Sequence, residues 1–200
     1  MSELDDSTDE RVDGDRRVRP LLAGMWARIR ARFAVDTRSL AALRIGLGVT
    51  LLVDLLGRAR NMATFYTDSG VYPLAAYEST YPEYTGLSLH ALSGELWLQQ
   101  LLFLLAGVVA VAFAVGYRSR LTGAVSLGLL VSLHARTPTV LNGGDKLLAV
   151  LLLVALVAPL GERWSVDAYR RGSARERVAS FGTAALLCQP LVVFAANAVL

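Results

Sequence analysis

The feature that most constrains this fold is a run of 21 residues, 96–116, that contains no charged side chain. A helix needs roughly 20 apolar residues to cross the hydrocarbon core of a bilayer, which is about 30 Å thick. The whole chain is 54% apolar and 18% charged, whereas a soluble domain is about 45–50% apolar and about 25% charged. These proportions exclude a disordered protein and an ordinary soluble enzyme, and one cysteine cannot build a disulfide scaffold. The sequence therefore predicts a membrane protein.

Other apolar runs predict further spans. We expect spans at residues 40–56, 96–116, 121–135, 147–160 and 179–200. The third and fourth runs have only 14–15 residues, so these helices must borrow flanking residues, tilt or lie inside the bundle. The expected fold class is all-α: a multispanning integral membrane helical bundle of about five spans.

The N-terminal region has a different character. Residues 1–18 are acidic and charged and lack the hydrophobic region of a signal peptide, so we expect a disordered tail. Residues 19–35 predict an amphipathic helix in the membrane interface, because an apolar stripe at helical spacing is flanked by arginines. The stripe consists of Leu22, Met25, Trp26, Ile29 and Phe33.

Residues 36–200 form the predicted transmembrane domain. Its last span reaches Leu200 without a polar stop, which suggests truncation at that end.

The basic residues predict the orientation of the spans. With the N-terminus inside, the inner segments hold eleven arginines, whereas the outer segments hold Arg58, Arg60, Arg136 and Lys146. Basic residues favour the cytoplasmic side. We therefore expect a multi-pass protein of the cell membrane with a cytoplasmic N-terminus, and with loops 57–95 and 136–146 outside. The basic residues lie beside spans rather than on one polar face, so the lipid bilayer is the expected partner and nucleic acid is excluded.

The outer loop 57–95 is the first candidate site. It carries five tyrosines together with acidic and histidine side chains, from which we select Tyr66, Asp68 and His90 as substrate-binding candidates. Interfacial tyrosines commonly anchor a protein among lipid headgroups, which is the simpler interpretation. A connection of nearly forty residues is long, however, and long loops are often functional. An extracytoplasmic peptide or protein partner could also bind there.

The second candidate site follows the third span. Ionisable groups at membrane depth are costly and therefore mark functional sites by default. From this segment we select Asn142, Asp145 and Lys146 as catalytic candidates, and His134, Arg136, Gly143 and Gly144 as substrate-binding candidates. The simpler alternative is that Asn142 caps the next helix, the glycines form its entry turn and Lys146 snorkels.

Two charged residues lie within the first span. Asp54 is placed to pair with Arg58 one turn later. Arg44 either snorkels towards the inner surface or needs a partner from elsewhere in the fold. His90 and His134 alone cannot make a three-ligand zinc site, although carboxylates could complete one. We predict no metal site.

Five segments of the chain resemble a known family. They are FYTDSGV at 65–71, SLHALSG at 88–94, GYRSR at 116–120, NGGD at 142–145 and WSVD at 164–167. In this order they resemble the HTTM (horizontally transferred transmembrane) domain, which is shared with vitamin K-dependent gamma-carboxylases. The resemblance covers about residues 36–200. It implies a reduced quinone as cofactor and a site on the extracytoplasmic face.

The resemblance leaves two functions open. The catalytic lysine of the carboxylases is not matched in this chain, and Gly143 stands where those enzymes have a histidine. Lys146 could act as a base only if burial lowered its pKa. The first function is a membrane enzyme that acts on a quinol or another lipid-phase substrate. The second is a non-catalytic helper for the maturation or export of a partner protein or peptide.

Overall fold

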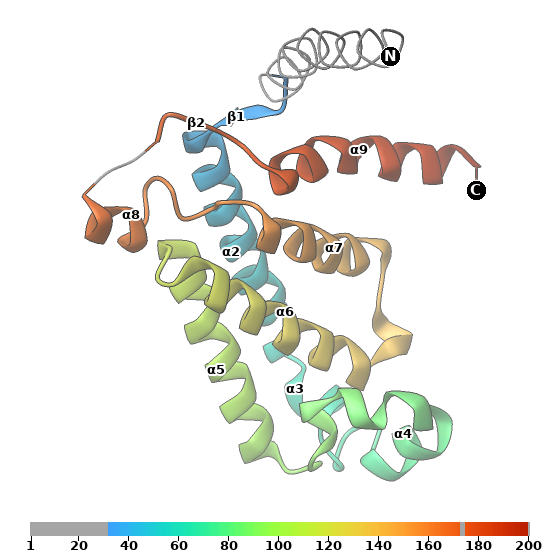
Figure 1. The fold of residues 1–200 in the computed structure, drawn as a ribbon. Coiled ribbons are helices and arrows are strands. Elements are labelled where there is room, and N and C mark those ends of the chain that lie inside the picture. Colours follow the sequence, from blue (N-terminus) through green and yellow to red (C-terminus); the bar gives the residue numbers. More distant parts are fainter. Residues whose placement is uncertain (1–31, 173–174, 200) are drawn as a thin grey trace, which may run out of the picture.

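The computed structural model describes residues 32–172 and 175–199. Within these residues the protein is mostly helical, as predicted. The long helices are α2 (Thr37–Ala59), α5 (Leu96–Val115), α6 (Ser119–Arg136), α7 (Gly143–Val157) and α9 (Phe181–Val199) (Figure 1). The short helices are α3 (Met62–Tyr66), α4 (Leu74–Thr80), η1 (Pro82–Leu87), η2 (Leu89–Ala91), η3 (Pro138–Val140) and α8 (Val166–Arg171).

Two of the described helices, α2 and α5, are long and apolar enough to cross a membrane. They pack closely against each other (Figure 1). A Cβ atom at Gly48 would lie 2.6 Å from the Cβ of Ala114, so only glycine permits this approach. The other three predicted spans coincide with α6, α7 and α9, where α7 has only 15 residues and α9 contains Pro190.

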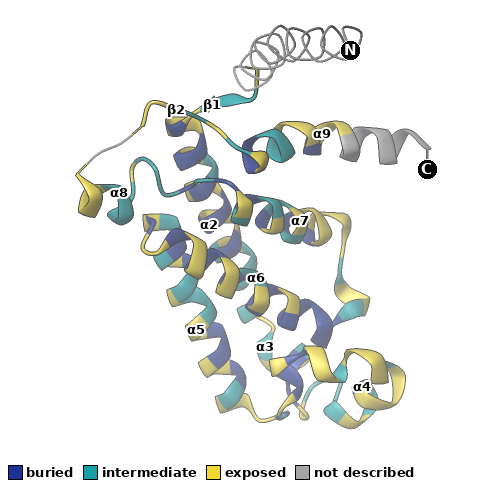
Figure 2. Ribbon diagram, viewed as in Figure 1, coloured by how far each residue is buried: buried dark blue, intermediate teal, exposed yellow. Residues whose placement is uncertain are grey.

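The core and the outer surface of the helices are both apolar. Figure 2 shows buried stripes along α2, α5, α6 and α7, and large apolar side chains of these stripes meet in the core. The outward faces of the same helices also expose apolar side chains. Val53, Leu104 and Val108 are 64%, 65% and 59% exposed, and Leu153 is 56% exposed. Exposed apolar surface on this scale favours a membrane environment over water.

The two ends of the helices differ in composition. The tyrosine-rich end, which we define as residues 60–95 and 137–145, contains α3, α4 and the short η helices (Figure 1). The arginine-rich end, residues 116–121, 158–172 and 175–180, contains α8 and one strand of a small two-stranded sheet. There β1 (Ala34–Asp36) pairs antiparallel with β2 (Arg177–Ala179), with Val35 opposite Val178.

This two-stranded sheet corrects part of the sequence interpretation. The predicted amphipathic helix over 19–35 lies mostly outside the described residues, as does the tail 1–18, but Ala34 and Val35 belong to a strand rather than a helix. A strand of three residues is too short to leave a period-two pattern in the sequence. Thr37 fixes the entry to α2, because its hydroxyl donates a hydrogen bond to the carbonyl of Arg175 at 2.7 Å.

Candidate functional site

An ionic cluster lies where α2, α6 and α7 meet the tyrosine-rich end. The guanidinium of Arg58 donates through Nε to both carboxylate oxygens of Asp54 at 3.0 Å, and through Nη2 to Asp145 at 2.6 Å. His134 completes the cluster, with its Nε2 atom 4.0 Å from the Asp145 carboxylate. The side chains of Arg58 and Asp145 are only 12% and 7% exposed. Two carboxylates therefore share one buried cation.

The segment before α7 holds Asp145 in place through a capping box. The Asn142 side chain accepts hydrogen bonds from the backbone N–H groups of Gly144 and Asp145, and the Asp145 carboxylate accepts from the N–H of Asn142 at 2.7 Å. This confirms that Asn142 caps the helix. A Cβ at Gly144 would lie 2.9 Å from the Asn142 side-chain oxygen, whereas Gly143 faces open space. The cap thus orients the carboxylate toward Arg58.

A cavity of about 280 Å³ opens beside the ionic cluster. Its polar wall includes Asp54, Arg58 and Asp145, and its apolar wall includes Phe65 and Val140. Tyr66 also lines the cavity, and its hydroxyl lies 3.4 Å from the Thr137 hydroxyl. An apolar cavity with a few convergent polar groups is the usual form of a small-molecule site.

The same cluster has the donor set of a metal site. One ligand atom from each of Asp54, His134 and Asp145 lies within 4.8 Å of the others. The position between the two carboxylates is taken by the guanidinium of Arg58. A divalent ion would have to displace Arg58 before it could bind both carboxylates. The charge of the two acids is already balanced in part by a side chain, so the arrangement fits a polar ligand better than a metal.

Lys146 does not join this cluster. It is exposed, whereas its neighbour Asp145, in the same first turn of α7, is buried. A base acts on a substrate within hydrogen-bond reach. The assignment of Lys146 as a catalytic residue stays a prediction, because the described contacts bring Asp145, and not Lys146, to the cavity.

His90 and Asp68 serve the packing of the loop 57–95. His90 is 2% exposed, its Nδ1 atom lies 2.7 Å from the Gln99 side-chain oxygen, and the Gln99 amide donates back to the His90 carbonyl at 3.0 Å. Burial lowers the pKa of His90 to about 4, against the hydrogen bond to Gln99, which raises it. Asp68 accepts a hydrogen bond from the N–H of Leu74 at 2.8 Å. The Asp68 carboxylate fills the space that a Cβ at Gly94 would need.

Arg136 is fully buried beneath α4. Its guanidinium donates to the carbonyl of Tyr72 at 2.9 Å and lies 4.8 Å from the ring centroid of Tyr77 and 5.7 Å from that of Tyr72. Cation–π contact with two rings stabilises the buried charge in part. Among the described residues, its Nε and Nη1 atoms have no hydrogen-bond partner. Arg136 therefore ties the loop 57–95 to α6 and does not line the cavity.

Arg58 and Asp54 are the charged cavity residues that were not among the site residues expected from the sequence. Their i, i+4 pairing was predicted and is confirmed at 3.0 Å. The sequence signal for a site was the presence of two opposite charges near the end of an apolar run. The contact from Arg58 to Asp145 spans 87 positions in the chain, so no local pattern could have shown it.

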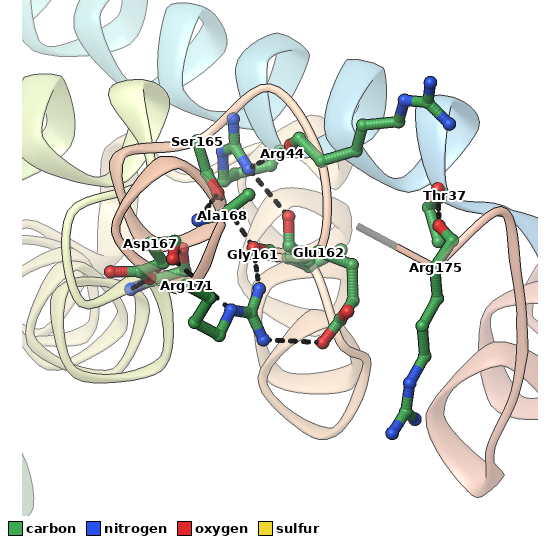
Figure 3. Close-up of polar contacts among 12 residues, drawn as sticks. Thr37, Arg44, Gly161, Glu162, Ser165, Asp167, Ala168, Arg171 and Arg175 are labelled. Atoms are coloured by element: carbon green, nitrogen blue, oxygen red, sulfur yellow. Dashed lines mark hydrogen bonds and ion pairs between the residues drawn. The ribbon is translucent and has the colours of Figure 1, made fainter. Parts of the chain in front are cut away.

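A second polar cluster holds the arginine-rich end together (Figure 3). Arg44 of α2 has no exposed surface and does not snorkel. Its guanidinium donates hydrogen bonds to four backbone carbonyls, at distances of 2.5–3.3 Å. These acceptors are Ala114, Leu160, Arg163 and Trp164. Arg44 thus joins the end of α5 to the turn that follows α7.

Asp167 fixes the turn between α5 and α6. Its carboxylate accepts hydrogen bonds from the N–H groups of Arg118 and Ser119 and from the Ser119 hydroxyl, all at 2.8 Å. These bonds lower the pKa of Asp167, although burial opposes them. The turn begins at Gly116, whose φ of 76° suits glycine. A Cβ there would also collide with Ser165. The GYRSR and WSVD segments therefore pack against each other.

The chain matches no family model, no curated protein and no solved structure. The case for a function therefore rests on the residues and on the geometry described above.

Proposed function

We propose that this chain is a multi-pass membrane protein of the HTTM type that binds the polar head of a quinol, or of another lipid-phase substrate, at its extracytoplasmic face. In this proposal α2, α5, α6, α7 and α9 are the five spans. The tyrosine-rich end is extracytoplasmic and the arginine-rich end is cytoplasmic, in agreement with the distribution of eleven against four basic residues.

The observation that carries the proposal is the cavity beside the ionic cluster. A ligand that arrives from the bilayer has an apolar body and a polar end. Phe65 and Val140 would contact the apolar body of the ligand, and Arg58 and Asp145 would contact its polar end. The cavity lies at the ends of apolar helices whose outward faces expose apolar side chains, which supports access for a membrane-dissolved molecule.

The ionic cluster also contains groups that can accept a proton. The Nε2 atom of His134 is buried and has no hydrogen-bond partner among the described residues. His134 does not line the cavity, but its Nε2 atom lies 4.0 Å from the Asp145 carboxylate, which does. In this proposal Asp145 accepts the hydroxyl proton of a quinol and His134 takes that proton from Asp145. Arg58 would stabilise the phenolate oxygen through a charge-assisted hydrogen bond.

The test is quinol consumption by the full chain in lipid nanodiscs with dioxygen present, using vitamin K hydroquinone as the probe. Epoxide and quinone are resolved chromatographically. We expect turnover above a protein-free control, and a loss of at least about tenfold in His134→Gln and Asp145→Asn, in line with removal of a general base. The matched control is Arg60→Gln, an exposed residue on the same side of the protein.

Two outcomes would contradict the proposal. One is the absence of both turnover and quinol binding in a folded sample, judged by its thermal unfolding. The other is full activity in His134→Gln and Asp145→Asn. If instead Lys146→Ala alone abolishes turnover while its unfolding temperature is unchanged, catalysis takes place on the exposed side of α7.

A helper function is supported by a different observation. Three apolar side chains at the tyrosine-rich end, Val71, Leu87 and Leu92, are 71%, 60% and 70% exposed. Tyr77 is fully buried and cannot contact a partner directly. In this second proposal, Val71→Ser and Leu92→Ser would abolish co-purification of an exported peptide or protein, while His134→Gln would leave it unchanged.

A further inference from the structure

A large cavity lies at the arginine-rich end, far from the ionic cluster. Its volume is about 660 Å³. It is formed by the start of α6, the turn after α7, and α8. We call it the arginine pocket and define it by four basic residues and two apolar ones that line it: Arg118, Arg120, Arg170, Arg171, Leu121 and Leu160.

The arginine pocket carries an excess of positive charge. Its walls hold four guanidinium groups and two carboxylates, those of Glu162 and Asp167. Both acids already have partners. Glu162 pairs with Arg171 at 2.9 Å, and the Asp167 carboxylate accepts the N–H groups of the turn before α6. Within the described residues, Arg118, Arg120 and Arg170 have no carboxylate within ion-pair distance.

Several contacts hold these guanidinium groups in place. Arg171 donates to the Gly161 carbonyl at 2.6 Å as well as to Glu162, as Figure 3 shows. Arg118 and Arg170 both lie over the ring of Tyr117, at 5.9 and 5.1 Å from its centroid. An arginine whose side chain is already ordered loses less entropy when it binds an anion.

Apolar surface continues from the pocket along the helices. Leu121 and Val125, one turn apart on α6, are 55% and 39% exposed, and Val157 at the end of α7 is 52% exposed. A ligand with a phosphate and acyl chains could place the phosphate among the arginines and the chains along this surface. Basic pockets between helices on the cytoplasmic side commonly bind anionic headgroups.

We propose that the arginine pocket binds the phosphate of an anionic phospholipid in the leaflet that surrounds this end of the protein. The ligand class follows from the pocket's chemistry: guanidinium groups bind phosphate oxygens through charge-assisted hydrogen bonds, and Leu121 and Val125 contact the acyl chains. The inference rests on the proposed membrane placement and does not depend on any chemistry at the tyrosine-rich end.

The experiment is native mass spectrometry of the full chain released from micelles that contain phosphatidylglycerol or phosphatidylcholine. Inorganic phosphate and glycerol 3-phosphate are tested as soluble competitors. The variant is Arg118→Gln/Arg170→Gln, since neither side chain makes a described hydrogen bond within the protein. The matched control is Arg38→Gln/Arg175→Gln, which removes the same charge from exposed positions at the same end. Figure 3 shows Arg175 apart from the Arg171 cluster.

We expect phosphatidylglycerol to remain bound to the wild-type chain and to the control, and phosphatidylcholine to be lost. The affinity of the pocket variant should fall about 25-fold, at roughly fivefold for each of the two arginines. Equal retention of the two lipids, or equal losses in variant and control, would overturn the proposal. Displacement of the lipid by millimolar inorganic phosphate would also overturn it, because the pocket would then be a site for free phosphate. Failure here leaves quinol turnover unaffected, so the two proposals can fail separately.

Discussion

Replacing Arg44 with methionine tests whether a buried arginine holds the arginine-rich end together. Methionine has a similar length but no donor, so four carbonyl groups lose their partner at once. A hydrogen bond contributes about 1 kcal/mol net to stability. In the wild-type protein, the cost of burying the guanidinium offsets part of the stability that each hydrogen bond contributes. In the variant, water that reaches the carbonyl groups recovers part of the stability that is lost. We therefore expect Arg44→Met to lower the free energy of unfolding by about 4 kcal/mol or slightly less.

The assay is reversible unfolding in mixed micelles with increasing SDS, followed by tryptophan fluorescence. Trp164, one of three tryptophans in the chain, has the carbonyl that accepts one of the four bonds. Arg44→Lys keeps the charge but has a shorter reach and a single nitrogen in place of three, so its loss should be about half as large. Arg38→Met is the control, because Arg38 lies on the same helix and is exposed. If Arg44→Met unfolds within about 1 kcal/mol of this control, the four hydrogen bonds do not hold the end together.

Three further predictions concern other parts of the fold. Gly116→Ala should destabilise the protein by about 1–3 kcal/mol, because alanine is strained at a φ of 76° and its Cβ has no room. The measurement is the SDS midpoint of unfolding. The control is Gly128→Ala, in open space on a helix, which should leave this midpoint unchanged or raise it. Asp145→Asn should lower the thermal unfolding temperature through loss of its buried ion pair, whereas Lys146→Ala should not. Equal effects of the two substitutions would contradict the burial of Asp145 and the exposure of Lys146. His90 has a pKa of about 4 in the fold and about 6.5 when unfolded, so the unfolded state binds more protons between these values. Stability should therefore fall, by up to about 3 kcal/mol, as the pH drops from 6.5 toward 4, and unfolding of the His90→Gln variant should show a flatter pH profile.

The five long helices could be predicted from the sequence to within a few residues, whereas the short helices were not predicted. The charge-free run 96–116 became α5, which ends at Val115 because Gly116 adopts a left-handed conformation. The pairing of Asp54 with Arg58 followed from helical spacing, and the capping role of Asn142 followed from the Asn-Gly-Gly-Asp pattern. In each case the interacting groups lie within four positions of each other, which is the range that local patterns can describe.

The assembled site could not be predicted in the same way. Arg58 meets Asp145 across 87 positions, and which of Asp145 and Lys146 faces the cavity depends on the rotation of α7 against α2. The partners of Arg44 were equally hidden. They are backbone carbonyls, and every residue has one, so no residue type marks them. For the same reason the sequence left open whether Arg44 snorkels.

The position of two buried arginines on one helix has a consequence for biosynthesis. Arg44 and Arg58 lie near opposite ends of α2, and their partners at Leu160 and Asp145 are 116 and 87 residues further along the chain. At about 5–20 residues per second, the ribosome needs roughly 6–23 s to complete that interval. During this time α2 has two charged groups without most of their final acceptors. In the proposed membrane placement, entry of α2 into lipid before α7 is made would leave both guanidinium groups without these acceptors, so we expect the two helices to enter the bilayer together.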